Sequence, residues 1–327
     1  MTNDLARADE GETAQKQAHP LFENPFHIED LLAFDENSLH RLLENNAFGV
    51  TFEELVTSLH GTSPRLVKHI LQSLNHKQRR RLRHALRSPL HEQDVQTARH
   101  HVLDNLFWEL TYWKTPELYE ELTEGEQLHP GIFQQLELDI RGKTILDVGA
   151  GSGRATLECL RVGASLVHAV EPSPGLLRLL SKKCAYQPVG QRVETYIGRF
   201  DAIPLPDASV DVALSCSAFT ASSEQGGEPG LREMRRVTKR GGKIVIIWPR
   251  VEDREWLQAH GFRYVSLPVQ QEMRVHFRSL QVAKECARRF YAHNRAVLRY
   301  IRIRKRPDVP FSVIGVNPPC DYYWIDV

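Results

Sequence analysis

The fold of this chain follows from the stretch TILDVGAGSGR at residues 144–154. Its first five residues, 144–148, predict a short buried parallel strand, and its glycines predict a tight turn. Residues 152–161 then predict the helix that leaves this turn. A strand, a glycine turn and a helix in this order hold a nucleotide-sized ligand in a doubly wound α/β fold. We therefore predict a Rossmann-like α/β fold with a ligand bound at this turn.

The spacing of the glycines and one carboxylate indicate which ligand binds. A dinucleotide fingerprint requires the pattern G-x-G-x-x-G, but here Gly153 comes one residue early and Arg154 holds the last glycine position. Asp147 lies two residues before the first glycine. A carboxylate there would repel a pyrophosphate, because both carry negative charge, whereas it suits a ligand with a cationic amino group. S-adenosylmethionine (SAM) is a ligand of this kind.

A second acidic residue, Glu171, supports the same ligand. It ends the next apolar strand, residues 166–170, about 20 residues after the glycines, where an acidic side chain accepts hydrogen bonds from ribose hydroxyls. The alternative is an α/β turn that is rich in glycine without binding a nucleoside. The order and spacing of the two acidic positions and the glycines favour the nucleoside site.

These segments resemble those of the class I SAM-dependent methyltransferases. The resemblance is carried by Asp147-x-Gly149-x-Gly151-x-Gly153, by Glu171, and by LPDASVDVA at residues 205–213, which is similar to a segment of the small-molecule and quinone or sterol branch. It implies a seven-stranded sheet within residues 107–327 and SAM as the cofactor, with no metal. The cofactor contacts that it implies are at Asp147, Gly149, Ala150, Gly151, Gly153, Glu171, Pro172, Phe200, Asp201 and Ser215.

The adenine contact departs from the family pattern. Related families commonly have an acidic residue directly after the glycine that ends the third strand, and it meets the adenine amino group. Here Arg199 follows Gly198, and Asp201 lies two residues further on. We expect the backbone and ring of Phe200 to contact adenine, with Asp201 as a second candidate.

Composition bounds the class of protein. The chain has 327 residues, 41% of them hydrophobic, and 42 basic side chains against 41 acidic ones, so its total charge favours neither nucleic acid nor a membrane surface. Its five cysteines form no C-x-x-C pair, which is typical of a reduced compartment. No signal-like segment and no apolar run of about 18 residues is present. We predict a soluble, cytoplasmic protein without a membrane span.

The segment before residue 107 predicts a separate helical module. Residues 1–19 are polar and predict a disordered tail. Residues 20–106 show apolar residues at helical spacing, interrupted by helix-starting residues such as Asp35, Thr51, Ser63 and Asn75. This module resembles the C-terminal domain of the flagellar rotor protein FliG over residues 24–105. The resemblance is carried by IEDLL at 28–32, by the segment from Leu55 through Leu59 to GTS at 61–63, by Ile70, Leu71 and Leu74, and by Pro89 with Asp94, Val95 and Ala98.

One helix of the module departs from that family. The torque helix of FliG mixes acidic and basic residues, whereas here it reads KQRRRLRHALR at 77–87. A motor role is therefore not implied, and the resemblance implies a helical scaffold for protein contacts. Residues 61–100 contain nine Lys or Arg against two acidic residues, a charge that attracts phosphates. A solvated helix face explains it as well, because no aromatic residues are interleaved for base stacking.

The remaining elements of the chain follow the family order. We predict strands at 193–197, 210–215, 243–248, 262–268 and 311–316, and helices at about 172–186, 228–238, 252–260 and 280–304, the last with a basic outer face. Asn317-Pro318-Pro319-Cys320 is interpreted as a turn that follows the last strand. The aromatic segment 107–113 either lines a substrate pocket or packs between the domains.

Three hypotheses follow for function. The first is a SAM-dependent methyltransferase that acts on a small-molecule or lipid-like acceptor, with the helical module as a docking or regulatory domain for a protein partner. The second is an RNA methyltransferase guided by basic helices, and the third is a non-catalytic SAM-binding scaffold. If the acceptor must be deprotonated, His129 and Tyr112 are candidate bases by position alone.

Overall fold

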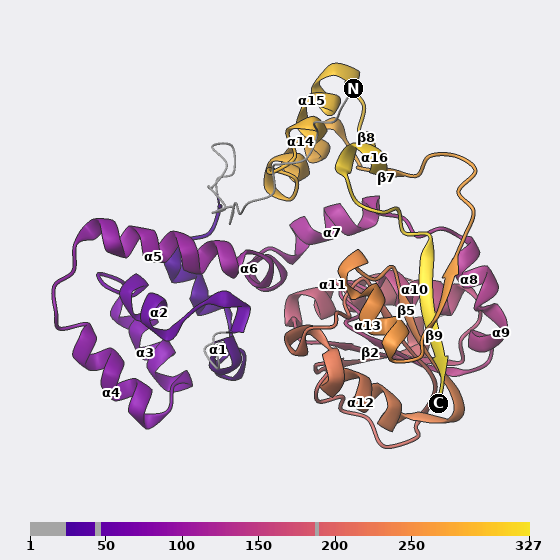
Figure 1. The fold of residues 1–327 in the computed structure, drawn as a ribbon, viewed down its shortest axis with the longest axis horizontal. Coiled ribbons are helices and arrows are strands. Elements are labelled where there is room, and N and C mark those ends of the chain that lie inside the picture. Colours follow the sequence, from indigo (N-terminus) through magenta and orange to yellow (C-terminus); the bar gives the residue numbers. More distant parts are fainter. Residues whose placement is uncertain (1–23, 43–46, 187–189) are drawn as a thin grey trace, which may run out of the picture.

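The computed structural model describes residues 24–42, 47–186 and 190–327, and the tail predicted at 1–19 lies outside them. Figure 1 shows a group of helices on one side and a sheet domain on the other. Helix α6 (Phe107–Lys114) lies between these two parts, and α7 (Pro116–Gly125) follows it. A smaller lobe sits above the sheet domain and is formed by β7 (Arg274–His276), α14 (Leu280–Arg289), α15 (Arg295–Arg304), β8 (Asp308–Pro310) and α16 (Phe311–Ile314).

The N-terminal part is helical, as predicted. Its elements are η1 (Ile28–Ala33), α1 (Glu36–Leu42), η2 (Ala47–Gly49), α2 (Phe52–Ser58), α3 (Pro64–Ser73), α4 (His76–Ala85) and α5 (Glu92–Asn105). The predicted helix starts are confirmed at Thr51, Ser63 and Asn75, whose side chains accept hydrogen bonds from backbone amides three residues later. The apolar residues at helical spacing bury their side chains in one core.

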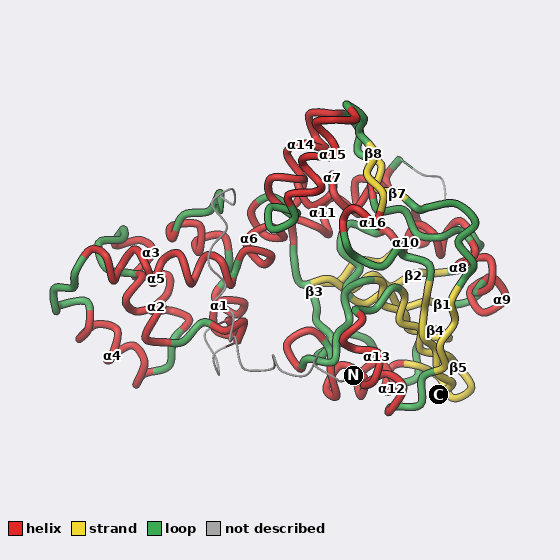
Figure 2. Tube along the Cα trace, turned by 45° about the horizontal axis from the view of Figure 1, so that its top comes forward, coloured by secondary structure: helices red, strands yellow, loops and turns green. Residues whose placement is uncertain are grey.

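The sheet has seven strands in the order β3-β2-β1-β4-β5-β9-β6, and among these described strands only β9 runs antiparallel to its neighbours. Figure 2 shows the strands between layers of helices. The strands are β1 (Thr144–Val148), β2 (Leu166–Glu171), β3 (Val193–Ile197), β4 (Val210–Cys216), β5 (Thr238–Ile247), β6 (Arg263–Ser266) and β9 (Asp321–Asp326). The helices around them are α8 (Gly131–Gln135), α9 (Glu137–Ile140), α10 (Arg154–Arg161), α11 (Pro174–Ala185), α12 (Gly227–Val237) and α13 (Arg254–Ala259).

This strand order confirms the predicted Rossmann-like α/β fold. β1 and β2 are buried along almost their whole length, which explains their continuous apolar sequences. The chain winds outward in opposite directions from β1 and β4, so the order reverses between these two strands. In doubly wound sheets, ligands bind outside the carboxyl ends of the strands at that switch point.

Two predictions for the last third of the chain are wrong. The helix predicted at 280–304 is divided into α14 and α15, because Asn294 caps α15 by accepting the Ala296 amide at 3.0 Å. Its side-chain amide nitrogen also donates to the carbonyls of Val313 and Ile314, which holds the Asn294 side chain against α16.

The closing strand is also not where the sequence placed it. Residues 311–314 form the short helix α16, which ends at Gly315 with φ +83°, and the antiparallel strand is β9. The Asn317 to Cys320 segment therefore precedes the last strand and does not follow it. The β7–β8 ladder was not predicted.

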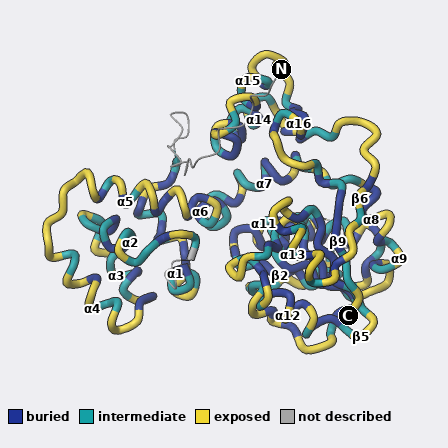
Figure 3. Tube along the Cα trace, viewed as in Figure 1, coloured by how far each residue is buried: buried dark blue, intermediate teal, exposed yellow. Residues whose placement is uncertain are grey.

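The packing is continuous across the boundary predicted at residue 106. Phe107 lies 5.9 Å from Phe26 of the N-terminal part and 6.1 Å from Phe290 of the upper lobe, measured between ring centroids. These three rings belong to one buried apolar cluster. Figure 3 shows buried segments along the sheet and exposed segments toward the outer end of the helical part, around α4.

Candidate functional site

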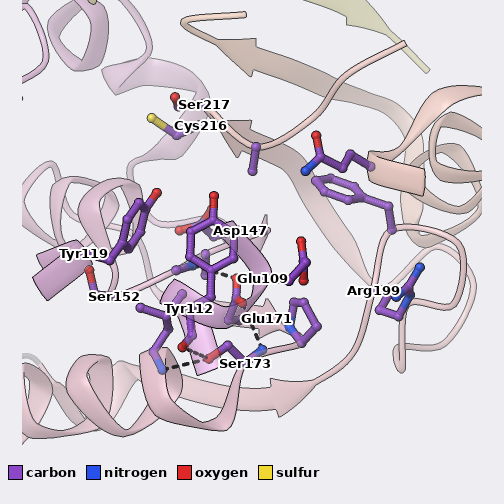
Figure 4. A pocket seen from close by; sticks show the side chains of 18 of the residues that line it. Glu109, Tyr112, Tyr119, Asp147, Ser152, Glu171, Ser173, Arg199, Cys216 and Ser217 are labelled. Atoms are coloured by element: carbon purple, nitrogen blue, oxygen red, sulfur yellow. Dashed lines mark hydrogen bonds between the residues drawn. The ribbon is translucent and has the colours of Figure 1, made fainter. Parts of the chain in front are cut away.

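A pocket lies at the switch point, above the carboxyl ends of β1, β2 and β4. Figure 4 shows side chains from two sources that point into it. The sheet wall comes from the strand ends and the loops that follow them, and consists of Asp147, Gly149–Ser152, Glu171–Ser173 and Cys216–Ala218. The helical wall comes from η2, α6 and α7 and consists of Phe48, Glu109, Tyr112, Trp113, Tyr119 and Thr123.

The glycine loop has two kinds of glycine. Both Gly151 and Gly153 have positive φ, at +56° and +98°. A Cβ on Gly153 would lie 2.3 Å from the Leu180 side chain, so this glycine allows α10 to pack closely on α11. A Cβ on Gly151 would meet no atom within 4 Å, and Gly151 lines the pocket. The loop therefore leaves its backbone open to a ligand at Gly151.

Asp147 places a buried carboxylate under this loop. Its Oδ2 accepts a hydrogen bond of 2.6 Å from the Thr156 hydroxyl of α10. Its Oδ1 is buried and has no hydrogen-bond partner among the described residues. Burial raises the pKa of Asp147 to about 6. An unpartnered buried carboxylate oxygen at the edge of a pocket fits a ligand that carries a cationic amino group.

Glu171 holds the glycine loop and faces the pocket. Its Oε2 accepts the Gly151 amide at 3.0 Å, and its Oε1 accepts the Ser173 amide at 2.9 Å. A carboxylate has about four lone-pair positions, so two remain for donors such as ribose hydroxyls. Burial raises the pKa of Glu171 to about 7, and the two backbone donors act against this rise.

The loop that follows β3 forms another side of the pocket. Phe200 lines the pocket, and its ring meets Phe219 edge to face at 5.5 Å. Asp201 also lines it, but its carboxylate forms ion pairs with Arg41 of α1 at 3.4 Å and with Arg199 at 3.3 Å. The ion pair with Arg41 joins the helical module directly to this loop.

The opposite end of the pocket lies beside the end of β4, where Tyr119, Arg154 and Cys216 meet. Arg154 is held by Glu126, with 3.5 Å between Nη2 and Oε2, and its guanidinium lies 5.5 Å from the Trp248 ring. Burial raises the pKa of Cys216 to about 12, so its thiol stays protonated at neutral pH. Arg154 gives this end of the pocket a cation.

Most of the predicted site residues come together here. Eight of them line the pocket: Asp147, Gly149, Ala150, Gly151, Glu171, Pro172, Phe200 and Asp201. Gly153 lies behind the loop, where it supports packing. Ser215 is fully buried within β4 and does not line the pocket. The next two residues, Cys216 and Ser217, line it instead.

The two candidate bases are placed differently. Tyr112 lines the pocket, but burial raises its pKa well above 10, so it stays a phenol. His129 does not line the pocket; its Nδ1 accepts the Gly131 amide at 3.1 Å, and its own amide donates to the Pro319 carbonyl. The geometry therefore gives His129 a role in the turn before α8.

The sequence did not predict Glu109, Tyr119, Arg154 and Cys216 as site residues. Arg154 directly follows the last glycine, and Cys216 is the last residue of β4 at the carboxyl edge of the sheet, so position along the chain was a usable signal for both. Glu109 and Tyr119 reach the pocket only because α6 and α7 pack over the sheet, and no local pattern marks them.

Comparisons with known proteins agree with this geometry. Residues 145–242 match the family described as a methyltransferase domain, and residues 11–106 match the FliG C-terminal domain family. An uncharacterized methyltransferase of Schizosaccharomyces pombe is 34% identical over 105 residues, which cover 32% of this chain and 38% of the relative. A ubiquinone/menaquinone biosynthesis C-methyltransferase of Geobacter sulfurreducens is 35% identical over 108 residues, which cover 32% of this chain and 41% of the relative.

Among solved structures, a SAM-dependent methyltransferase of Aquifex aeolicus is similar over 46% of this chain and 89% of its own, with 22% identity and a TM-score of 0.39. The matched segment thus spans about two fifths of the length of the two curated relatives, at 38% and 41%. No helix among the described residues has the length and apolar character needed to cross a bilayer.

The strand order and the glycine-loop pocket define a doubly wound, nucleotide-binding α/β domain. With the match over residues 145–242, this domain is a class I SAM-dependent methyltransferase domain, and the helices that precede it are a FliG C-terminal-like module. SAM is the cofactor of this family, and the free Oδ1 of Asp147 and the open backbone at Gly151 fit it.

Proposed function

We propose that this protein transfers the methyl group of SAM to a small-molecule or lipid-like acceptor. The observation that carries the proposal is the pairing of two buried carboxylates, Asp147 and Glu171, on either side of the open Gly151 backbone. Asp147 would hold the amino group of the cofactor, and Glu171 would hold its ribose. The Geobacter relative, whose name describes a quinone-biosynthesis C-methyltransferase, supports a planar apolar acceptor.

The bound cofactor supplies a methyl group that its sulfonium has already activated. The chain contributes orientation and exclusion of water, which are the main requirements of a displacement of this kind. The helical wall serves both needs, because Tyr112 and Tyr119 meet edge to face at 4.8 Å over the pocket. Arg154 offers a cation for a carboxylate at the end of the pocket near β4.

The titratable groups of the pocket limit the chemistry of the acceptor. Burial raises the pKa values of Tyr112, Tyr119 and Cys216 far above neutral, so these groups do not accept protons as anions near pH 7. Asp147 and Glu171 are committed to the cofactor. None of these five groups is thus available as a base, which favours an acceptor that is nucleophilic without a strong base, such as an electron-rich ring carbon or a carboxylate.

An RNA substrate is the second candidate, and the surface of α4 favours it. Arg80 and Arg83 of α4 and Arg87, two residues after its end, are exposed and line one groove. Helix α4 lies at the outer end of the helical module (Figure 1). The basic surface predicted at 288–306 is partly neutralised, since Arg289 pairs with Glu285 and Arg306 with Asp308. Steep weakening of RNA binding with salt would support this candidate.

The helical module is proposed to dock a protein partner or to regulate the enzyme. Its match to the FliG C-terminal domain family supports a scaffold for protein contacts. Its ion pair from Arg41 to Asp201 and its contribution of Phe48 to the pocket support a link between such contacts and the site.

The test is a methyl-transfer assay with methyl-labelled SAM, offered separately to a small-molecule extract, a lipid extract and total RNA. We expect label in an organic-extractable or small-molecule product with the wild-type protein. We expect none with Glu171→Ala, whose folding is checked by thermal melting. Label found only in RNA would replace the proposal with the second candidate. No label above the Glu171→Ala control in any pool would contradict an enzyme role.

A further inference from the structure

The loop that follows β3, where we expect adenine to bind, offers no carboxylate without a cationic partner among its described residues. Gly198 is followed by Arg199, and the next acidic residue, Asp201, is occupied by its ion pairs with Arg41 and Arg199. Asp201 is thus turned toward two guanidinium groups. An adenine amino group bound beside Phe200 would therefore compete with these two cations for Asp201, whereas an unpaired carboxylate from another element could accept it directly.

Glu109 of the helical wall lies at this end of the pocket. It lines the pocket together with Glu171 and Arg199, and Figure 4 shows its carboxylate between these two residues. None of the described residues donates a hydrogen bond to Glu109 or forms an ion pair with it. Burial raises the pKa of Glu109 to about 7, while the charge of Arg199 acts against this rise. A partly buried carboxylate without a partner, next to the ribose carboxylate, faces the place of the base.

The position of Glu109 is set by contacts of α6 on both sides. Toward the sheet, the Ser173 hydroxyl donates to the Tyr112 carbonyl at 2.7 Å, which fixes α6 on the loop after β2. Toward the helical module, Trp113 meets Phe34 at 5.5 Å between ring centroids, and Phe34 is buried in the core of the module. Glu109 is therefore held by rigid packing between the module and the cofactor loop.

We propose that Glu109 accepts a hydrogen bond from the exocyclic amino group of adenine, so that the helical side of the molecule recognises the base. The inference rests on the proposed function, because it assumes that the pocket binds a SAM-like nucleoside. It assigns to α6 a contact that the β3 loop of this chain does not supply. Adenine recognition is then coupled to the seating of the FliG-like module on α6.

The test compares S-adenosylhomocysteine with its analogue that has hydrogen in place of the 6-amino group, by calorimetric titration into the full chain. We expect wild type to bind the adenine compound at least about tenfold more tightly, as for a hydrogen bond to a charged acceptor. In Glu109→Ala the ratio of the two affinities should fall to about one, and in Glu109→Gln the ratio should be intermediate. Asp201→Asn is the matched control and should keep the wild-type preference.

The ratio of the two affinities separates recognition from a structural role. A variant that only loosens α6 weakens both ligands equally and leaves the ratio unchanged, as in a double-mutant cycle. A wild-type ratio retained in Glu109→Ala, or a ratio lost in Asp201→Asn instead, overturns the inference while the cofactor site stands. Failure of folded wild type to bind either compound overturns the proposed function together with this inference.

Discussion

The sheet wall and the helical wall of the pocket differ in how each is encoded. The sheet wall comes from strand ends and the short loops that follow them. Asp147 at the end of β1 is held by Thr156 of α10, and Gly151 is held by Glu171 at the end of β2. The helical wall assembles Phe48, Glu109 and Tyr119 from three separate elements. The sheet wall is thus built by local backbone geometry, and the helical wall by tertiary packing.

This difference predicts two kinds of response to mutation. Changes in the sheet wall disturb backbone turns and buried charges, so they alter both folding stability and cofactor binding. Changes in the helical wall remove side chains that meet the ligand across a packed interface, so they alter affinity or selectivity with little effect on stability.

The largest effect is expected at Gly153. Gly153→Ala places a Cβ into the Leu180 side chain at positive φ, and we expect a loss of roughly 3 kcal/mol or more in the free energy of unfolding, from strain and overpacking. Gly151→Ala is the matched control: it shares the positive φ but meets open space, and should cost about 1 kcal/mol. Urea unfolding of both variants measures the difference. An equal loss of unfolding free energy in the two variants would show that the close approach of Gly153 to Leu180 does not affect stability.

An intermediate effect is expected from the buried charge of Asp147. Its pKa is raised from 3.8 to about 6, so the folded state favours the protonated form, and this stability is lost as pH rises through about 6. The contribution of Asp147 to the free energy of unfolding should fall by roughly 1 kcal/mol between about pH 5 and pH 7 in the ligand-free protein. Asp147→Asn should remove this part of the pH dependence in urea unfolding. An unchanged pH slope in the variant would contradict a raised pKa at Asp147.

The smallest effect is expected at the ion pair between the helical module and the sheet domain. The side chains of Arg41 and Asp201 are 39% and 38% exposed, so their attraction is weak and screened by salt. Arg41→Ala should lower SAM affinity by no more than about threefold at low salt, and by less at high salt. Arg80→Ala, which changes a cation on α4 away from the pocket, should leave affinity unchanged. A loss above about tenfold in Arg41→Ala would make this contact a principal determinant of binding.

The same contrast explains what could be predicted from sequence. The strands at 144–148 and 193–197 and the pocket-lining residues of the sheet wall were predictable, because apolar strands and glycine turns are local signals. Glu109 was not, since its role depends on how α6 packs against Phe34 and Ser173, which no periodicity reveals. The errors at 280–304 and 311–316 have a related cause. Asn294 caps α15 through the Ala296 amide, and its amide nitrogen is held by the carbonyls of Val313 and Ile314, which lie about 20 residues away.

Calorimetric titration of SAM into the purified full chain, with Glu171→Ala as the paired variant, tests whether this pocket holds the cofactor. Glu171 both holds the glycine loop and faces the ribose part of the pocket, so the two measurements address the site itself. We predict micromolar binding by wild type and its loss in folded Glu171→Ala. The absence of binding by folded wild type, or equal affinity in the variant, would contradict the assignment of this pocket as the cofactor site.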